Sequence, residues 1–258
     1  MGGKKKKNRS SRRFLTRVWI TCLKIFLCLV FFSALQVLLF RFVDPPVTVP
    51  MLWGWAKGAA GGKPYAWPGY RWRPLEKISP HLLRAVLAGE DQRFFRHHGF
   101  DFVELEEAVR DLLHSGRVRG ASTITMQTAR SLFLWPGRSL VRKALEAYYT
   151  ILIELFWEKR RILEVYLNTV DWGEGAVGAE AASRKYFRRS ADRLTLGQAA
   201  ALAAVLPSPH RWSPVDPNRR VLERKRRILR DMKSLFPGGL PVRLSRGADS
   251  RPGRPSFQ

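Results

Sequence analysis

The chain has little cysteine, and its two cysteines lie close together. Of its 258 residues only Cys22 and Cys28 are cysteine, and both lie in one apolar stretch. Six residues apart, they would project from well-separated parts of a helix surface, which argues against an intrachain disulfide. The rest of the chain has none, so oxidation neither stabilises nor threatens it.

Acidic residues are also scarce. The chain has 21 Asp and Glu against 46 Lys and Arg, giving a formal net charge of +25. Residues 1–24 carry +9 and residues 219–254 another +9, which leaves +7 for the long middle part. Such basic ends suit an anionic surface, either nucleic acid or phospholipid. Because 45% of the residues are hydrophobic, a chain disordered throughout is excluded.

Several common patterns are absent. No segment alternates apolar and polar residues over the length of a strand, and no internal repeat occurs, so we predict a mainly α fold. A phosphate-binding P-loop is excluded because no Gly-Lys-Ser/Thr follows a strand. The N-terminal Met-Gly-Gly-Lys lacks the Ser/Thr of a myristoylation signal.

One long hydrophobic run is present near the N-terminus. Residues 25–40 contain no charge, and 18–40 give 23 residues, long enough to cross a hydrocarbon core of ~30 Å. A cleaved signal peptide is the alternative, but the run is long for one and no small-x-small cleavage site follows. Basic residues precede the run, so we predict a single transmembrane helix with a cytoplasmic N-terminus and an exported remainder.

The chain divides by composition into five parts. Pro45, Pro46 and Pro50 predict a stiff, extended connector, followed by a Trp- and Tyr-rich stretch that suits either a membrane interface or ordinary packing. The predicted parts are a basic tail (1–17), a transmembrane helix (18–40), a connector (41–63), a domain (64–236) and a disordered tail (237–258).

Capping residues mark the predicted helices of the domain. Ser79-Pro80 predicts one start, and Thr195 with Gln198 predicts a capping box. The predicted helices are one after Ser79, 103–113, one capped by Ser122 or Thr123, one from Ser139 to about Trp157, 159–168, one from Thr195 to Pro207, and a basic helix over 218–236.

Glu90 and Asp91 are the first candidate for chemistry. They end an apolar helix beside aromatic residues, where burial raises the pKa of a carboxyl towards the range of a general base. A solvated helix end is the alternative reading. A metal site from His97, His98 and Asp101 is a weaker possibility, because adjacent histidines point in different directions.

Two further groups could bind an anion. Ser122 and Thr123 open a helix whose free backbone N–H groups favour negative charge, with Arg130 and Arg138 following, although a routine helix cap explains the same residues. Arg142, Lys143 and Glu146 lie on one helix, where Arg142 and Glu146 form either a surface ion pair or a second acid beside cations in a cleft.

Taken together, these segments resemble the peptidoglycan glycosyltransferases of family 51, which also form the N-terminal domain of bifunctional penicillin-binding proteins. The matching motifs are ED-x-x-F-x-x-H-x-G (Glu90 to Gly99), GASTIT-x-Q (Gly120 to Gln127), RK-x-x-E (Arg142 to Glu146), RRILE-x-YLN (ending at Asn168) and G-x-x-G-x-E-A-A (Gly175 to Ala182). The resemblance covers roughly residues 64–235. No Ser-x-x-Lys transpeptidase motif follows, so we expect the stand-alone, monofunctional form of Gram-negative bacteria.

The resemblance implies a lysozyme-like, mainly helical domain on the outer face of the inner membrane. It implies that the substrates are lipid II and the growing glycan chain, and that the linkage formed is β-1,4 with inversion. Glu90 would be the general base and Glu146 the second acid, assisting the departing pyrophosphate. The implied substrate-binding residues are Asp91, Ser122, Thr123, Gln127, Arg130, Arg138, Arg142 and Lys143.

The resemblance also implies what accompanies the enzyme. We expect a divalent cation (Mg²⁺ or Mn²⁺) at the pyrophosphate and no organic cofactor. Membrane lipids are expected partners of segment 101–119 and of the basic helix, together with cell-division or cell-wall synthesis proteins, but not nucleic acid. Met126 departs from the family, which usually has glutamine there, so we expect reduced donor affinity at most.

Two other classes of function also fit parts of this sequence. A hydrolase or lytic transglycosylase would share the fold, but it would have no pyrophosphate to bind with the basic residues at 130–143. A basic anchored scaffold or DNA-binding protein would fit the charged ends, although export would separate it from nucleic acid. A scaffold would tolerate the loss of Glu90, whereas the enzyme would not.

Overall fold

The structure is a computed structural model. It describes residues 3–62, 65–116, 120–173 and 175–238, with side chains described from residue 16 onward. The chain divides into two compact units, residues 1–43 and 44–258, which we describe separately. The predicted disordered tail lies outside the described residues, apart from 237 and 238.

The first unit is one long helix, α1 (Gly3–Phe42). Its stretch Thr16–Phe42 is 27 residues long with a mean hydropathy of 2.4, long and apolar enough to cross a membrane. The predicted span 18–40 lies within this stretch. Most of its large apolar side chains are exposed, as expected of a helix whose solvent is lipid rather than protein.

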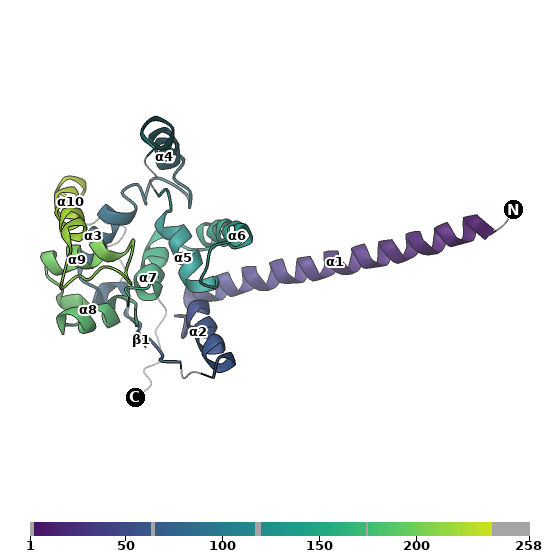
Figure 1. The fold of residues 1–258 in the computed structure, drawn as a ribbon, viewed down its shortest axis with the longest axis horizontal. Coiled ribbons are helices and arrows are strands. Elements are labelled where there is room, and N and C mark those ends of the chain that lie inside the picture. The colour runs from purple at the N-terminus through teal and green to yellow at the C-terminus, as the bar shows by residue number, and fades with distance from the viewer. Residues whose placement is uncertain (1–2, 63–64, 117–119, 174, 239–258) are drawn as a thin grey trace. The chain divides into compact units, whose positions relative to one another are not determined.

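The second unit is mainly helical, which confirms the predicted class (Figure 1). Its elements are α2 (Val49–Ala60), β1 (Gly69–Tyr70), η1 (Leu75–Lys77), α3 (Pro80–Glu90), α4 (Phe102–Ser115), α5 (Ile124–Phe133), α6 (Leu140–Phe156), α7 (Lys159–Thr169), β2 (Ala176–Val177), α8 (Ala179–Phe187), η2 (Ala191–Arg193), α9 (Leu196–Val205) and α10 (Arg219–Leu235).

One expectation about secondary structure is wrong. The predicted extended connector is interrupted by α2, because Pro50 occupies the first turn of that helix, where its missing N–H costs no hydrogen bond. Strands are also present, although β1 and β2 have only two residues each. They pair in parallel, with Gly69 opposite Ala176, and are too short to show an alternating pattern in the sequence.

The capping predictions are confirmed. Ser79 accepts from the backbone N–H of His81, Ser139 caps α6, and Thr195 forms the capping box with Gln198. At α5 the cap is Thr123 rather than Ser122. These caps fix where the helices that carry the candidate site begin.

The core is built by two groups of helices. α3, α9 and α10 pack against one another, and α5 packs against both α6 and α7 (Figure 1). α7 is central, since every residue from Arg161 to Thr169 is buried. α3 and α5 carry Glu90 and Gln127, so the two packed groups meet at the candidate site.

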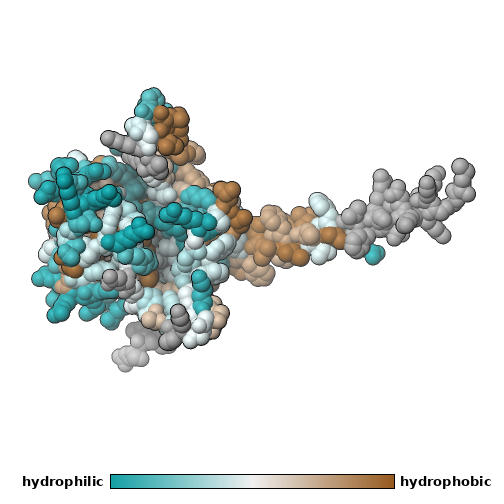
Figure 2. Space-filling model, in the orientation of Figure 1, coloured by the Kyte–Doolittle hydropathy of each residue, from teal (hydrophilic) through white to brown (hydrophobic). Residues whose placement is uncertain are grey.

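α4 is mostly exposed, since Ala108 is its single buried residue. Large apolar side chains lie exposed along it, and Figure 2 shows this apolar surface at the tip of the unit. They are Phe102, Val103, Leu105, Val109, Leu112 and Leu113. An exposed apolar helix of this kind fits the predicted lipid-facing segment 101–119, of which residues 117–119 lie outside the described part.

Candidate active site

Glu90 is the last residue of α3, and its carboxylate is nearly buried, with 11% of the side chain exposed. Oε2 accepts a hydrogen bond from Nε2 of Gln127 on α5 at 2.9 Å. Oε1 forms an ion pair with Arg224 of α10 at 2.6 Å. Three helices that are distant in sequence therefore meet at this one carboxylate.

Burial holds the pKa of the Glu90 carboxyl above its usual range. The positive charge of Arg224, the hydrogen bond from Gln127 and the charge of Arg130 all oppose that rise. A carboxylate with a raised pKa is a better proton acceptor than an ordinary surface glutamate. The charges of Arg224 and Arg130 still favour its ionised form. The electrostatics therefore suit a general base.

Arg224 is a site residue that the sequence reading missed. It lies in the basic helix that we predicted as a lipid-headgroup contact, among several other basic residues, and nothing in its local pattern marks it out. Its guanidinium also donates to the backbone carbonyl of Gly89 at 2.8 Å. The available signal was the apolar stripe of α10, which turns one face of that helix towards α3.

Asp91, next to Glu90, faces a different set of partners. Its carboxylate accepts the backbone N–H of Ile124 at 2.9 Å and contacts Nε2 of His97 at 2.9 Å. It therefore connects the end of α3 to the start of α5. Its predicted contact with substrate stays a prediction.

By distance alone, Asp91, His97 and Asp101 could hold a metal ion, since their candidate ligand atoms lie within 4.8 Å of one another. This corrects the metal site considered from the sequence, which consisted of His97, His98 and Asp101. In the structure His98 is exposed, and Asp91 is the third residue of the group. However, Asp101 accepts two backbone N–H groups of α4 and the Nε of Arg93. Because these oxygens already have partners, the cluster fits a structural link better than a metal cage.

The motif at the start of α5 supplies both structural and site residues. Thr123 is buried, caps the helix and donates to the carbonyl of Gly99 at 2.6 Å. Ser122 is half-buried and lines the cavity beside Glu90. Met126, where the family usually has glutamine, is buried among core residues.

Glu146 lies on α6 and is buried, with 1% of its side chain exposed. Oε2 accepts from Arg142 at 2.9 Å and Oε1 accepts from Lys143 at 2.6 Å. Arg142 is also buried, so the pair is not a surface ion pair, and Arg142 itself lines a cavity. Both oxygens are occupied by cations from the same helix.

Two cavities lie on either side of Gln127, which lines both. One, of about 430 Å³, contains Glu90, Ser122 and Arg224. We call it the Glu90 cavity. The other, of about 540 Å³, contains Arg130 and Arg142, and we call it the arginine-side cavity. Arg138 and Lys143 are exposed near the start of α6 and do not line either cavity.

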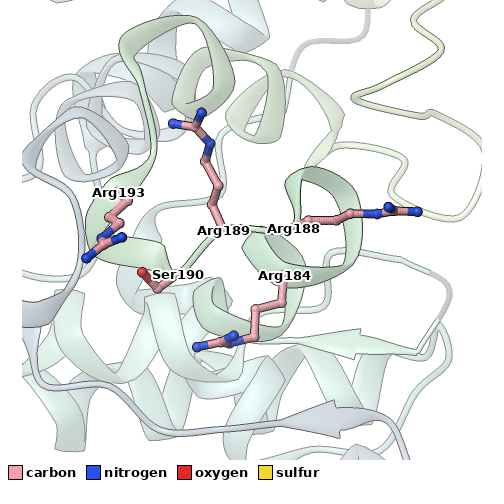
Figure 3. A pocket seen from close by; sticks show the side chains of 5 residues that line it. All are labelled: Arg184, Arg188, Arg189, Ser190 and Arg193. Carbon is pink, nitrogen blue, oxygen red and sulfur yellow. The ribbon is translucent and has the colours of Figure 1, made fainter.

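A further hollow of about 540 Å³ is lined by arginines of α8, of η2 and of the short link between them, and none of its lining residues is shared with these two cavities. Figure 3 shows that Arg184 and Arg188 extend in opposite directions and that Arg189 extends in a third. Arg184 is paired with Glu180. The guanidinium groups of Arg184 and Arg188 therefore do not face each other.

The arrangement defines a class of protein. A nearly buried carboxylate in one cavity, with a second cavity lined by Arg130 and Arg142 beside it, suits a group-transfer enzyme that deprotonates one substrate and holds an anionic group of another. Residues 64–233 match the Transglycosylase family. The chain belongs to that family.

Relatives match most of the chain. A protein of Caulobacter vibrioides named biosynthetic peptidoglycan transglycosylase is 47% identical over 206 residues, 80% of this chain and 87% of its own. Proteins with the same name are 48% identical in Pseudomonas putida strain W619, over 85% of this chain and 92% of theirs, and 44% identical in Shewanella oneidensis, over 86% and 94%.

Proposed function

We propose that this chain joins lipid II units into β-1,4-linked glycan strands and releases undecaprenyl pyrophosphate. Family membership makes it a peptidoglycan glycosyltransferase of cell-wall synthesis. The single observation that carries the finer proposal is the Glu90 carboxylate, nearly buried and set beside a cavity large enough for a sugar unit. The resemblance of the motifs supplies the identity of the substrates.

In this proposal the acceptor sugar occupies the Glu90 cavity. Glu90 takes the proton from its 4-hydroxyl while that oxygen attacks the anomeric carbon of the growing chain. The bond from that carbon to the pyrophosphate breaks, and inversion results from attack on the face opposite the leaving group. A raised pKa favours proton transfer to Glu90, and the ion pair with Arg224 keeps the carboxylate available as a base.

The donor pyrophosphate occupies the arginine-side cavity. Arg130 and Arg142 line it, and Arg138 and Lys143 stand nearby as further cations. Negative charge grows on the leaving group as the glycosidic bond breaks, and cations held in advance stabilise that charge. Glu146 acts through these cations, because its two oxygens hold Arg142 and Lys143 in place.

The other residues that were predicted to bind substrate have two kinds of role in this proposal. Ser122 and Gln127 contact the acceptor, whereas Asp91 and Thr123 support the start of α5 from buried positions. A divalent cation, Mg²⁺ or Mn²⁺, would neutralise negative charge on the pyrophosphate as it leaves. Mg²⁺ is commonly bound by substrate phosphates with few protein ligands, so the proposal does not require a metal site made entirely of protein side chains.

We place the domain on the periplasmic side of a bacterial inner membrane, with α1 as the anchor and the N-terminus in the cytoplasm. Basic residues before the apolar stretch support this orientation. A polyprenyl substrate stays in the bilayer, so an anchored enzyme searches for it in two dimensions and meets it already oriented. Proteins of cell division or cell-wall synthesis are the proposed partners.

Polymerisation of labelled lipid II by the purified full chain in detergent with Mg²⁺ or Mn²⁺ tests the proposal. Wild type should give long glycan strands, and Glu90→Gln should lose roughly 10³-fold in rate while melting at a similar temperature. Fragments from preformed glycan, with no strands from lipid II, would instead identify a hydrolase. Equal rates for both proteins would overturn the role of Glu90.

A further inference from the structure

Glu90 is the end of a chain of three side chains from three helices. The hydroxyl of Tyr166 on α7 donates to Oε1 of Gln127 on α5 at 3.0 Å. Nε2 of Gln127 then donates to Oε2 of Glu90 at 2.9 Å. The amide oxygen of Gln127 is therefore hydrogen-bonded to Tyr166, and its amide nitrogen is hydrogen-bonded to Glu90.

Tyr166 is fully buried in the middle of α7. Burial raises the pKa of its hydroxyl well above the usual range, so the group stays protonated and can donate. Among the described residues, Gln127 is the one polar partner of this hydroxyl. A buried hydroxyl without a partner is costly, so the contact with Gln127 satisfies Tyr166 as well as restraining Gln127.

Gln127 needs such a restraint because it lies between two open spaces. It lines both the Glu90 cavity and the arginine-side cavity. A glutamine side chain has several rotatable bonds, and its amide can turn so that oxygen rather than nitrogen faces a neighbour. With oxygen facing Glu90, two acceptors would oppose each other and the carboxylate would lose a hydrogen bond.

We propose that Tyr166 is a positioning residue for the transfer reaction, which holds the Gln127 amide so that its nitrogen faces Glu90. The inference rests on the proposed role of Glu90 as the base. Tyr166 touches no substrate, since it is buried and lines neither cavity. Its effect on the reaction passes through Gln127 alone.

Tyr166→Phe in the full-length protein tests this role, because it removes the hydroxyl and keeps the ring in the core. We expect kcat for lipid II polymerisation to fall roughly tenfold with KM unchanged, the effect of losing one buried hydrogen bond. Tyr70→Phe is the matched control, since Tyr70 donates to the backbone carbonyl of Pro45 and lines neither cavity. Equal kcat values for wild type and Tyr166→Phe would overturn the proposal.

A double-mutant cycle shows whether Tyr166 acts through Gln127. In a Gln127→Met background, adding Tyr166→Phe should leave kcat unchanged, because the amide to be positioned is gone. If the second substitution lowers kcat by the same factor as in wild type, Tyr166 acts by another route and the proposal fails.

A spectroscopic measurement separates this inference from the proposed function. The side-chain amide resonances of Gln127, assigned in the detergent-solubilised full chain by their loss in Gln127→Met, report the two hydrogen bonds directly. They should shift in both Tyr166→Phe and Glu90→Gln and stay unchanged in Tyr70→Phe. Shifts without any polymerising activity would reject the proposed function but keep the geometry, whereas unchanged resonances in Tyr166→Phe would reject the positioning role.

Discussion

The two acids of the candidate site are surrounded in different ways. Glu146 takes both of its partners, Arg142 and Lys143, from its own helix, three and four residues away. Glu90 takes Arg224 from a position 134 residues along the chain and Gln127 from one 37 residues along. One acid is held by local helix geometry and the other by the packing of three helices.

This difference corresponds to two kinds of chemistry. A carboxylate with a cation on each oxygen serves best as a fixed support for those cations. A carboxylate with a raised pKa at the wall of a cavity is suited to accept a proton. Two glutamates in one site can therefore have different roles because their surroundings differ.

The largest effect on stability should come from removing Glu146. Glu146→Ala leaves Arg142 buried without its partner, which should lower the free energy of unfolding by about 3–5 kcal/mol. Thermal unfolding of the full chain in detergent measures the change. Glu106→Ala is the control, because Glu106 pairs with Arg110 in an exposed position and should cost less than about 0.5 kcal/mol. Equal losses in the two variants would show that Glu146 is solvated.

Arg224→Gln should change the pH dependence of the reaction. The charge of Arg224 lowers the pKa of Glu90, so its removal raises that pKa and fewer molecules carry an ionised base at low pH. We expect the acid limb of kcat/KM to move to higher pH, with a loss of roughly tenfold at its acid end and little loss at high pH. Exposed Arg220→Gln is the control. A loss that is equal at every pH would contradict the pairing.

Ser139→Ala should have a smaller effect, on the helix that holds Glu146. Ser139 caps α6 by accepting the backbone N–H of Arg142 at 3.1 Å, and such caps are worth about 1 kcal/mol. Chemical unfolding of the full chain measures the loss, and Ser139→Asp should restore most of it. If the alanine variant is as stable as wild type, the start of α6 is held by packing rather than by its cap.

The smallest effect on stability should come from Lys143→Gln. With 49% of its side chain exposed, Lys143 is the more solvated of the two cations on Glu146, and its loss should cost less than about 1 kcal/mol. Thermal unfolding beside Glu146→Ala measures the difference. A loss as large as that of Glu146→Ala would mean that the two cations contribute equally.

The sequence alone determined the local part of this protein. Helix positions followed from the apolar periodicity and from caps such as Ser79, Ser139 and Thr195, which act within one turn of the backbone. The pairing of Arg142 with Glu146 could also be predicted from the sequence, because residues four apart lie on one face of a helix. The helix α2 was missed, because Pro50 fits both an extended segment and a first helical turn.

Only the tertiary structure decided what surrounds the base. Arg224 reaches Glu90 because α10 packs against α3, and Tyr166 reaches Gln127 because α7 packs against α5. The apolar pattern of α7 accounts for the burial of the Tyr166 ring, but it does not show what the hydroxyl contacts. Periodicity shows which face of a helix is buried, but it does not show which residue of another helix lies opposite. That choice depends on how the helices pack, and it defines the environment in which Glu90 would act.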